Sequence, residues 1–371
     1  MAAPRFHTLE IAAIRNETPD AVAISFAIPE YLSDTFAFLP GQYLTLRADI
    51  DGEDMRRSYS ICSELGETGH RTVGVKRIAE GRFSGFAQTL KKGDRIEVMP
   101  PQGRFTAQIG GEHEYLLLAA GSGVTPCLSI AKSVLAGEPH STVTLLYANR
   151  TSSSVMFLDD LNALKDRYTG RFTLLHVLDE EIQDVEIMNG RLDAAKLEAL
   201  AERGLIDPTL ADAIYICGPE PMIRAASTAL SALGVSEDRL KFELFTPAPG
   251  ASSANAAFRT ATPAQPTAAT DGASANSQGA AVDIILDGAR RTIHVDANTD
   301  TILSAATKAG LDLPYSCAGG MCCTCRCKII EGTASMDENF SLEPWEIEAG
   351  FTLSCQARPT AEKLVLDFDA Q

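Results

Sequence analysis

Five of the nine cysteines in this chain fall within eleven consecutive residues. Four residues separate Cys317 from Cys322, two separate Cys322 from Cys325, and Cys355 follows after 29 more. Plant-type [2Fe–2S] clusters are bound with this spacing, because four thiolates must surround two irons from one loop and one distant anchor. The spacing therefore predicts a [2Fe–2S] cluster held by Cys317, Cys322, Cys325 and Cys355.

Other uses of these cysteines fit less well. A disulfide framework would spread the cysteines along the chain and would need an oxidising compartment. Zinc sites usually contain two short Cys or His pairs, whereas Cys355 stands apart from the others. Cys323 breaks both spacings and Cys327 lies outside them, so we interpret both as loop or core residues. Gly319 and Gly320 would let the loop backbone curl so that its N–H groups reach the sulfurs.

A second pattern is typical of phosphate binding. Residues 119–126 read Ala-Ala-Gly-Ser-Gly-Val-Thr-Pro, after an apolar strand and at the start of a helix. Gly121 and Gly123 would allow close approach of a pyrophosphate to the helix N-terminus. The third glycine of the dinucleotide fingerprint is missing, so a simple Rossmann dehydrogenase is not supported. Cys217, Gly218 and Pro219 end a later strand, at the sheet edge where ligands bind.

Arg150 ends the second strand of the same sheet and is followed by Thr-Ser-Ser-Ser. An arginine with hydroxyls suits a 2′-phosphate, and residues 149–154 contain no acidic residue that could hold a ribose 2′-hydroxyl. The pattern favours NADPH over NADH. The alternative is an arginine in a solvated loop.

Two short motifs in the first third of the chain suggest a flavin site. Residues 57–60 (Arg-Ser-Tyr-Ser) lie on a predicted strand, where alternation puts Arg57 and Tyr59 on one face. Residues 81–84 (Gly-Arg-Phe-Ser) begin the one helix predicted in this part, a position that favours anions. Together they fit a ring-stacking tyrosine, a phosphate-pairing arginine and a capped pyrophosphate. The alternative is a core tyrosine beside a surface arginine.

Three domains would position these residues. Residues 1–108 contain short strands separated by turn signals and are expected to form an antiparallel β-barrel or sandwich. Residues 109–245 alternate apolar strands with helices, the pattern of an α/β doubly wound parallel sheet. A flexible linker rich in Ala, Ser, Thr and Pro is predicted over residues 246–281. Residues 282–371 would form the cluster domain.

The predicted elements follow from apolar periodicity. Strands are predicted at residues 21–28, 43–50, 72–78, 95–100, 115–120, 143–147, 172–177, 213–216, 240–244, 282–286, 291–295 and 363–368, and helices at 83–90, 126–136, 156–167, 193–203, 220–233 and 301–309.

Composition restricts the partners. The 371 residues carry a formal net charge of −17, which opposes binding to nucleic acid or to anionic membranes. No segment reads as a signal peptide or as the ~18 apolar residues of a membrane span, so a soluble cytoplasmic protein is expected. Residues 282–371 hold 14 Asp and Glu against 7 Lys and Arg. We hypothesise that this acidity steers the cluster domain to a basic patch on a partner.

The motifs, taken in order, resemble the ferredoxin–NADP reductase superfamily fused to a C-terminal plant-type ferredoxin. The resemblance lies in residues 57–60, 81–84, 119–126, 217–219 and 243–245 (Glu-Leu-Phe). It covers the whole chain except the linker. Four further blocks are similar to the reductase subunits of phenylacetyl-CoA 1,2-epoxidases, at residues 90–105, 147–151, 313–317 and 353–357.

The resemblance implies a six-stranded barrel that binds FAD and a β-grasp ferredoxin domain. Arg57 would pair with the FAD phosphate, Tyr59 would stack on the isoalloxazine, and Ser60 would approach its N5 atom. Further cofactor-binding residues implied by the resemblance are Ser58, Val75, Lys76, Gly81 and Ser84 for FAD, and Gly121, Gly123, Thr125, Pro126, Cys217, Gly218 and Pro219 for the nicotinamide dinucleotide. Glu243 and Phe245 would end the module beside the flavin, with Phe245 shielding the ring. The implied catalytic group is Tyr59, Ser60, Cys217, Glu243 and Phe245.

The predicted function is therefore an NADPH-dependent flavin and iron–sulfur oxidoreductase. It would pass electrons to the oxygenase of a multicomponent monooxygenase, a diiron phenylacetyl-CoA epoxidase of phenylacetate degradation. One alternative is the reductase of a Rieske-type quaternary-amine demethylase. Another, from a different class, is a non-catalytic redox carrier or sensor, although a carrier needs no hydride site.

Overall fold

The computed structural model describes residues 6–245 and 279–370. The described residues up to 245 belong to one compact unit and those from 279 onward to a second. Nearly all of the linker predicted over residues 246–281 lies outside the described residues, so it stays a prediction. Among the described residues, no helix has both the length and the apolar character needed to cross a membrane.

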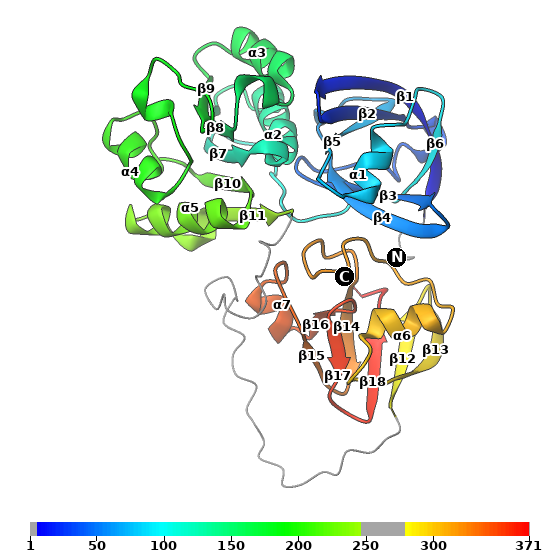
Figure 1. The fold of residues 1–371 in the computed structure, drawn as a ribbon. Helices are drawn as coiled ribbons and strands as arrows, with labels where there is room; N and C mark the ends of the chain where they lie inside the picture. Colours follow the sequence, from blue (N-terminus) through cyan, green and yellow to red (C-terminus); the bar gives the residue numbers. More distant parts are fainter. Residues whose placement is uncertain (1–5, 246–278, 371) are drawn as a thin grey trace. The chain divides into compact units, whose positions relative to one another are not determined.

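The first unit begins with a six-stranded antiparallel sheet (Figure 1). Its strands are β1 (His7–Thr18), β2 (Ala21–Ala27), β3 (Tyr43–Ile50), β4 (Glu53–Ser60), β5 (His70–Lys76) and β6 (Arg95–Val98), in the order β4-β3-β6-β1-β2-β5. Ile61, directly after β4, forms a bridge with Val73 of β5, and the Cys62 N–H donates to the Thr72 carbonyl at 2.8 Å. These contacts join the two edge strands, so the sheet closes into the predicted barrel.

Strand β1 is absent from the sequence-based expectation. Its pairing with β2 shifts register between Ile11 and Ala13 and again between Asn16 and Thr18. Each irregularity interrupts the alternation of inward and outward side chains, which is the pattern used to recognise a strand. The helix expected at residues 83–90 is α1 (Arg82–Ala87), which is shorter.

The second part of this unit is an all-parallel five-stranded sheet in the order β11-β10-β7-β8-β9 (Figure 1). The strands are β7 (Glu114–Ala120), β8 (Thr142–Asn149), β9 (Phe172–Leu178), β10 (Ala213–Gly218) and β11 (Leu240–Leu244), and the helices are α2 (Val124–Gly137), α3 (Leu158–Arg167), α4 (Ala194–Glu202) and α5 (Glu220–Ala232). Strand order reverses between β7 and β10, so the ligand crevice of such a sheet is expected at the carboxyl ends of these strands. The doubly wound prediction is confirmed.

The barrel and the parallel sheet share one core. The rings of Phe105 and Tyr215 meet edge to face with centroids 5.3 Å apart. The buried Ser129 hydroxyl of α2 donates to the Ser63 carbonyl of the barrel at 2.7 Å. Because apolar packing and a buried hydrogen bond both cross this boundary, it is a fixed interface.

The second unit carries a mixed five-stranded sheet in the order β13-β12-β18-β14-β16. Its elements are β12 (Ala280–Leu286), β13 (Ala289–Val295), α6 (Ile302–Lys308), β14 (Arg326–Glu331), β15 (Ala334–Met336), α7 (Pro344–Glu348), β16 (Phe351–Leu353), β17 (Ala357–Pro359) and β18 (Lys363–Asp367). Strands β14 to β17 were not predicted, because three of them are only three residues long and β14 begins inside the cysteine-rich segment.

Short 3-10 helices complete the described chain. They are η1 (Glu30–Leu32), η2 (Gly121–Gly123), η3 (Ser152–Ser154), η4 (Glu186–Met188) and η5 (Glu237–Arg239).

Candidate functional site

The four predicted cluster ligands come together as two pairs. The Cys317 sulfur is in hydrogen-bond contact with that of Cys322, and the Cys325 sulfur with that of Cys355. In the part of the chain that the structure describes, no three His, Cys, Asp or Glu side chains are arranged around a single ion. Two thiolate pairs are the donor set that a [2Fe–2S] cluster needs, one pair for each iron.

The loop backbone is shaped around these sulfurs. The Gly319 N–H donates to the Cys317 sulfur at 3.4 Å, and the Cys317 N–H donates to the Cys322 sulfur at 3.5 Å. Gly320 has a φ of +76°, and a Cβ there would lie 3.0 Å from the Glu338 carbonyl oxygen, so the curl favours glycine. The Cys322 thiol and neighbouring backbone N–H groups lower the pKa of Cys317 to about 6, and the same contact raises the pKa of Cys322, so the pair shares one proton.

The two remaining cysteines of the segment differ from the four. Cys327 lies on β14, is fully buried in the core of the second unit, and has its pKa raised by that burial. Cys323 adopts a left-handed backbone conformation with a φ of +56°. The fully buried Cys327 is therefore a core residue of the second unit.

The barrel presents the predicted flavin motif on β4. The Tyr59 ring lies against Phe83 of α1, with centroids 5.9 Å apart, and burial raises the pKa of its hydroxyl, which therefore stays protonated. Arg57 is exposed, and its Nη1 donates to the Arg56 carbonyl at 2.7 Å. Ser58 lies 3.1 Å from the hydroxyl of Thr45 on β3. Tyr59 and Arg57 thus offer a ring and a cation from the same strand.

The other predicted flavin residues differ in their burial and in their contacts. The Ser84 hydroxyl accepts from the Ile78 N–H and donates to the Gly81 carbonyl, both at 3.1 Å, so it holds the turn before α1. Val75 is fully buried in the barrel core, so its side chain lines no open surface. Lys76 is partly buried, with its Nζ 3.8 Å from the Asp20 carboxylate.

Four predicted catalytic residues lie where barrel and sheet adjoin. The Ser60 hydroxyl of β4 donates to the Glu243 carboxylate of β11 at 3.4 Å. Glu243 is the register partner of Cys217 on β10, and Cys217 is fully buried. Phe245 packs against the core shared by barrel and sheet. Burial raises the pKa of Glu243 to about 8, so its carboxyl group can hold a proton near neutral pH.

This pKa predicts a pH dependence of stability. An unfolded glutamate has a pKa of about 4.3, so folding favours the protonated form of Glu243 and takes up a proton between pH ~4.3 and ~8. The stabilising contribution is fully present below pH ~4.3 and is lost as the pH rises to about 8. The Tm of Glu243→Gln minus the Tm of wild type should therefore increase steadily as the pH rises from 5 to 8.

Thermal unfolding of the purified holoenzyme across this pH range measures the effect. Glu198→Gln removes a carboxylate at an exposed position of α4 and should leave the pH slope of wild type intact. Parallel pH slopes for wild type and Glu243→Gln would contradict the prediction.

The glycine turn after β7 is fixed from several sides. The buried Tyr147 hydroxyl donates to the Gly121 carbonyl, and Thr125 donates to the Ser122 carbonyl, both at 2.9 Å. A Cβ on Gly121 would meet no protein atom within 4 Å, whereas one on Gly123 would lie 2.1 Å from the Cys217 carbonyl oxygen. Gly121 therefore leaves open space for a ligand, and Gly123 allows β7 and β10 to approach each other.

Three further predicted nucleotide-binding residues, Pro126, Gly218 and Pro219, lie close to these turns. Pro126 is buried in the first turn of α2. Gly218 lies beside Ala120 and Met222, so a Cβ there would be 2.7 Å from the Met222 methyl. Pro219 is the N-cap of α5. The two predicted nucleotide motifs are thus side by side at the carboxyl ends of β7 and β10.

Two acidic residues from other parts of the chain contact the segment 149–154, which itself contains no acidic residue. The Arg150 guanidinium lies 4.0 Å from the Asp20 carboxylate, which comes from the β1–β2 hairpin. Glu181, which follows β9, accepts hydrogen bonds from Ser152. Neither is near Arg150 in sequence, so no local pattern could have revealed them.

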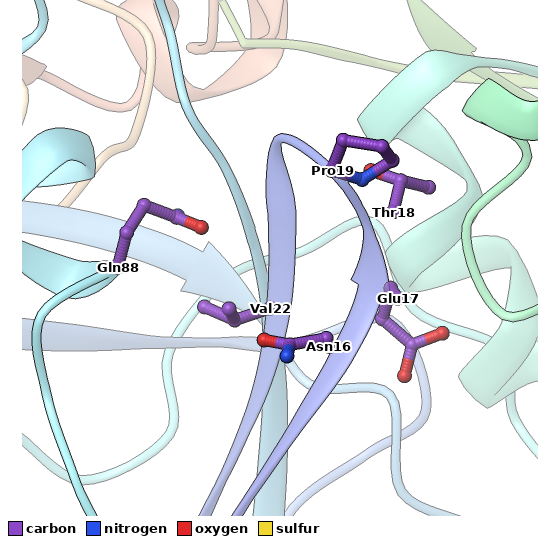
Figure 2. A pocket seen from close by; sticks show the side chains of 6 residues that line it. All are labelled: Asn16, Glu17, Thr18, Pro19, Val22 and Gln88. Carbon is purple, nitrogen blue, oxygen red and sulfur yellow. The ribbon is translucent and has the colours of Figure 1, made fainter.

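An open pocket of about 470 Å³ lies beside the same hairpin (Figure 2). Figure 2 shows Thr18 and Pro19 at the hairpin tip and Gln88 across from them. It is lined by Asn16, Glu17, Thr18, Pro19, Val22 and Gln88, none of which was predicted as a site residue.

Family models match three successive parts of the chain: "Oxidoreductase FAD-binding domain" at residues 8–107, "Oxidoreductase NAD-binding domain" at 117–228 and "2Fe-2S iron-sulfur cluster binding domain" at 284–360. The chain is 43% identical to a subunit of the 1,2-phenylacetyl-CoA epoxidase of Escherichia coli, over 99% of this chain and 98% of the relative. It is 35% identical to the ferredoxin reductase component of 3-ketosteroid-9-alpha-monooxygenase of Rhodococcus rhodochrous, over 97% and 96%. The chain belongs to the family of oxygenase reductase components.

The fold of the reductase has a solved counterpart. Phthalate dioxygenase reductase, described as a modular structure for electron transfer from pyridine nucleotides to [2Fe–2S], matches with a TM-score of 0.57 and 21% identity, over 98% of both chains. The predicted resemblance and fold class are confirmed, and the reductase is an oxidoreductase with FAD-, NAD- and [2Fe–2S]-binding domains.

Proposed function

We propose that the reductase takes hydride from NADPH and delivers single electrons to the oxygenase of a phenylacetyl-CoA epoxidase. One observation supports this proposal: the same chain places Ser60, Cys217 and Glu243 together where barrel and sheet adjoin and brings four cysteine sulfurs together as two pairs. When bound, FAD accepts a hydride and releases electrons one at a time to a [2Fe–2S] cluster. A carrier or sensor would need only the thiolate pairs.

The residues of the barrel would hold the flavin. Tyr59 offers a neutral aromatic face, and the exposed Arg57 offers a cation for a phosphate. Ser60 and Glu243 would hold a proton at the inner edge, because Ser60 donates to a carboxylate whose pKa is about 8. Phe245, at the end of β11, would exclude water from that edge.

The residues of the parallel sheet would bind the nucleotide. Gly121 leaves space for the pyrophosphate, and Cys217 places a small buried side chain at the switch between β7 and β10. Lys76 and Arg150 both approach Asp20, which brings a barrel residue and a sheet residue to one place. Arg150 is 61% exposed, which leaves its guanidinium accessible to a 2′-phosphate.

Replacing Arg150 with alanine should raise the KM for NADPH roughly tenfold and change the KM for NADH less than about twofold, because only NADPH carries the 2′-phosphate. Steady-state reduction of ferricyanide measures both constants. Arg203→Ala removes an exposed arginine just after α4 and serves as the control. Equal effects of Arg150→Ala on the two nucleotides would rule out a 2′-phosphate contact.

An anaerobic NADPH titration followed by visible absorbance tests the electron path, with iron, sulfide and flavin measured on the same sample. The proposal expects one FAD and one [2Fe–2S] cluster per chain, both reduced by NADPH. Reconstitution with the purified epoxidase oxygenase should then give phenylacetyl-CoA-dependent NADPH oxidation. A reductase that supports only a Rieske-type demethylase would favour the alternative partner.

A further inference from the structure

The segment after β9 runs alongside the end of β8. The Asp179 N–H donates to the Asn149 carbonyl at 3.1 Å, and the Glu180 N–H donates to the Arg150 carbonyl at 2.9 Å. Because these bonds fix the backbones side by side, residues 179–181 (Asp-Glu-Glu) stand next to Arg150. The Asp179 carboxylate pairs with Arg191 at 3.4 Å, so the carboxylate that reaches residues 149–154 from this segment is that of Glu181.

The Glu181 side chain is hydrogen-bonded to Ser152. Its carboxylate accepts a hydrogen bond from the Ser152 N–H at 2.7 Å, and the Ser152 hydroxyl lies 3.0 and 2.9 Å from its two oxygens. A backbone N–H and a hydroxyl at the carboxyl end of a parallel strand are the donors that a phosphate oxygen takes. These hydrogen bonds also lower the pKa of Glu181, so the carboxylate is ionised at neutral pH. The donors of Ser152 therefore already hold an anion.

A second observation marks the same strand end as a ligand position. Asn149 is 8% exposed, and apart from its approach to the Tyr147 hydroxyl its side-chain amide is buried without a hydrogen-bond partner in the described part of the chain. The neighbouring Tyr147 hydroxyl already donates to the Gly121 carbonyl and accepts from the Met156 N–H. Buried amide groups are rarely left without partners unless a ligand or water supplies them. The last residue of β8 therefore has hydrogen-bonding capacity that a nucleotide hydroxyl or phosphate could use.

We propose that Glu181 is a specificity-determining residue that competes with the 2′-phosphate of NADPH for the donors of Ser152. This inference rests on the proposed nucleotide site and sharpens it. NADH can bind with the Glu181 carboxylate in place. NADPH must displace that carboxylate and tolerate its charge, with Arg150 as the compensating cation. The reductase thus accepts both nucleotides, and its preference for NADPH is held below what Arg150 alone would give.

Three variants test this proposal. Glu181→Ala removes both the charge and the occupant of Ser152, Glu181→Gln removes the charge alone, and Glu180→Ala removes a charge from the adjacent exposed residue. We measure kcat/KM with NADPH and with NADH, using ferricyanide as acceptor. Glu181→Ala should raise the NADPH to NADH ratio roughly tenfold, Glu181→Gln by a smaller factor, and Glu180→Ala by less than about twofold.

Calorimetric binding of 2′,5′-ADP and of 5′-AMP to the holoenzyme gives a readout independent of electron transfer. The proposal expects Glu181→Ala to tighten binding of 2′,5′-ADP and to leave that of 5′-AMP unchanged. An unchanged ratio in Glu181→Ala, or equal rises in Glu181→Ala and Glu180→Ala, would overturn the role of Glu181. If neither NADPH nor NADH reduced the wild-type flavin, that result would instead count against the proposed function. The calorimetry would still decide whether Glu181 opposes binding of the 2′-phosphate.

Discussion

Replacing Cys325 with serine is expected to remove the cluster while leaving the flavin able to accept hydride. Cys325 is buried and pairs with Cys355, so a serine there would offer a hydroxyl, which does not ionise as a thiol does, to an iron that favours sulfur. Losing one of four ligands leaves one of the two irons with a single thiolate, so the cluster is no longer held from both sides. Electron transfer to a one-electron acceptor that depends on the cluster should fall at least about tenfold.

The measurement combines iron and sulfide content, the visible spectrum, and NADPH-driven reduction of cytochrome c beside that of ferricyanide. Cys323→Ser is the matched control, because Cys323 lies two residues away on the same loop but outside the two sulfur pairs. The control should keep its iron. If Cys323→Ser loses iron and Cys325→Ser retains it, the assignment is wrong, and Cys323 rather than Cys325 is the cluster ligand.

A second large effect is expected from Gly123→Ala. The added Cβ would lie 2.1 Å from the carbonyl oxygen of Cys217 and 2.5 Å from its carbon. Both are backbone atoms, so no side-chain rotation can relieve the overlap, and the ends of β7 and β10 must separate. We expect a loss of about 3 kcal/mol in the free energy of unfolding. Because the same two strand ends border the proposed nucleotide site, the KM for NADPH should rise at least about tenfold.

Thermal unfolding and steady-state kinetics check this prediction. A loss of about 3 kcal/mol corresponds to a fall of roughly 6–12 °C in the Tm of a unit of this size. Gly85→Ala is the control, because a Cβ at this position of α1 meets nothing within 4 Å. Its Tm should stay at or slightly above that of wild type, since alanine favours a helix. Unchanged stability of Gly123→Ala would mean that the two strands can part at little cost.

The local motifs could be read from the sequence because each is set by short-range geometry. Cysteine spacing indicates the four cluster ligands, since one loop must place three thiolates around two irons. Glycines after an apolar strand mark a turn whose backbone must approach another chain segment or a ligand, and the structure places Gly123 against Cys217. The alternation of apolar strands and helices likewise indicated the parallel sheet, because buried strands and amphipathic helices have different periods.

Contacts between distant segments were decided by the tertiary structure. Ser60 and Glu243 lie 183 residues apart in the chain, and only the fixed interface between barrel and sheet brings them within hydrogen-bond distance and raises the pKa of Glu243. Glu181 reaches Ser152 because β8 and β9 are neighbours whose carboxyl ends meet at one edge. Spacing along a chain describes local geometry alone. The burial and charge around a side chain depend on which strands become neighbours, and this is why the acidic residues beside Arg150 and Ser152 were visible only in the folded protein.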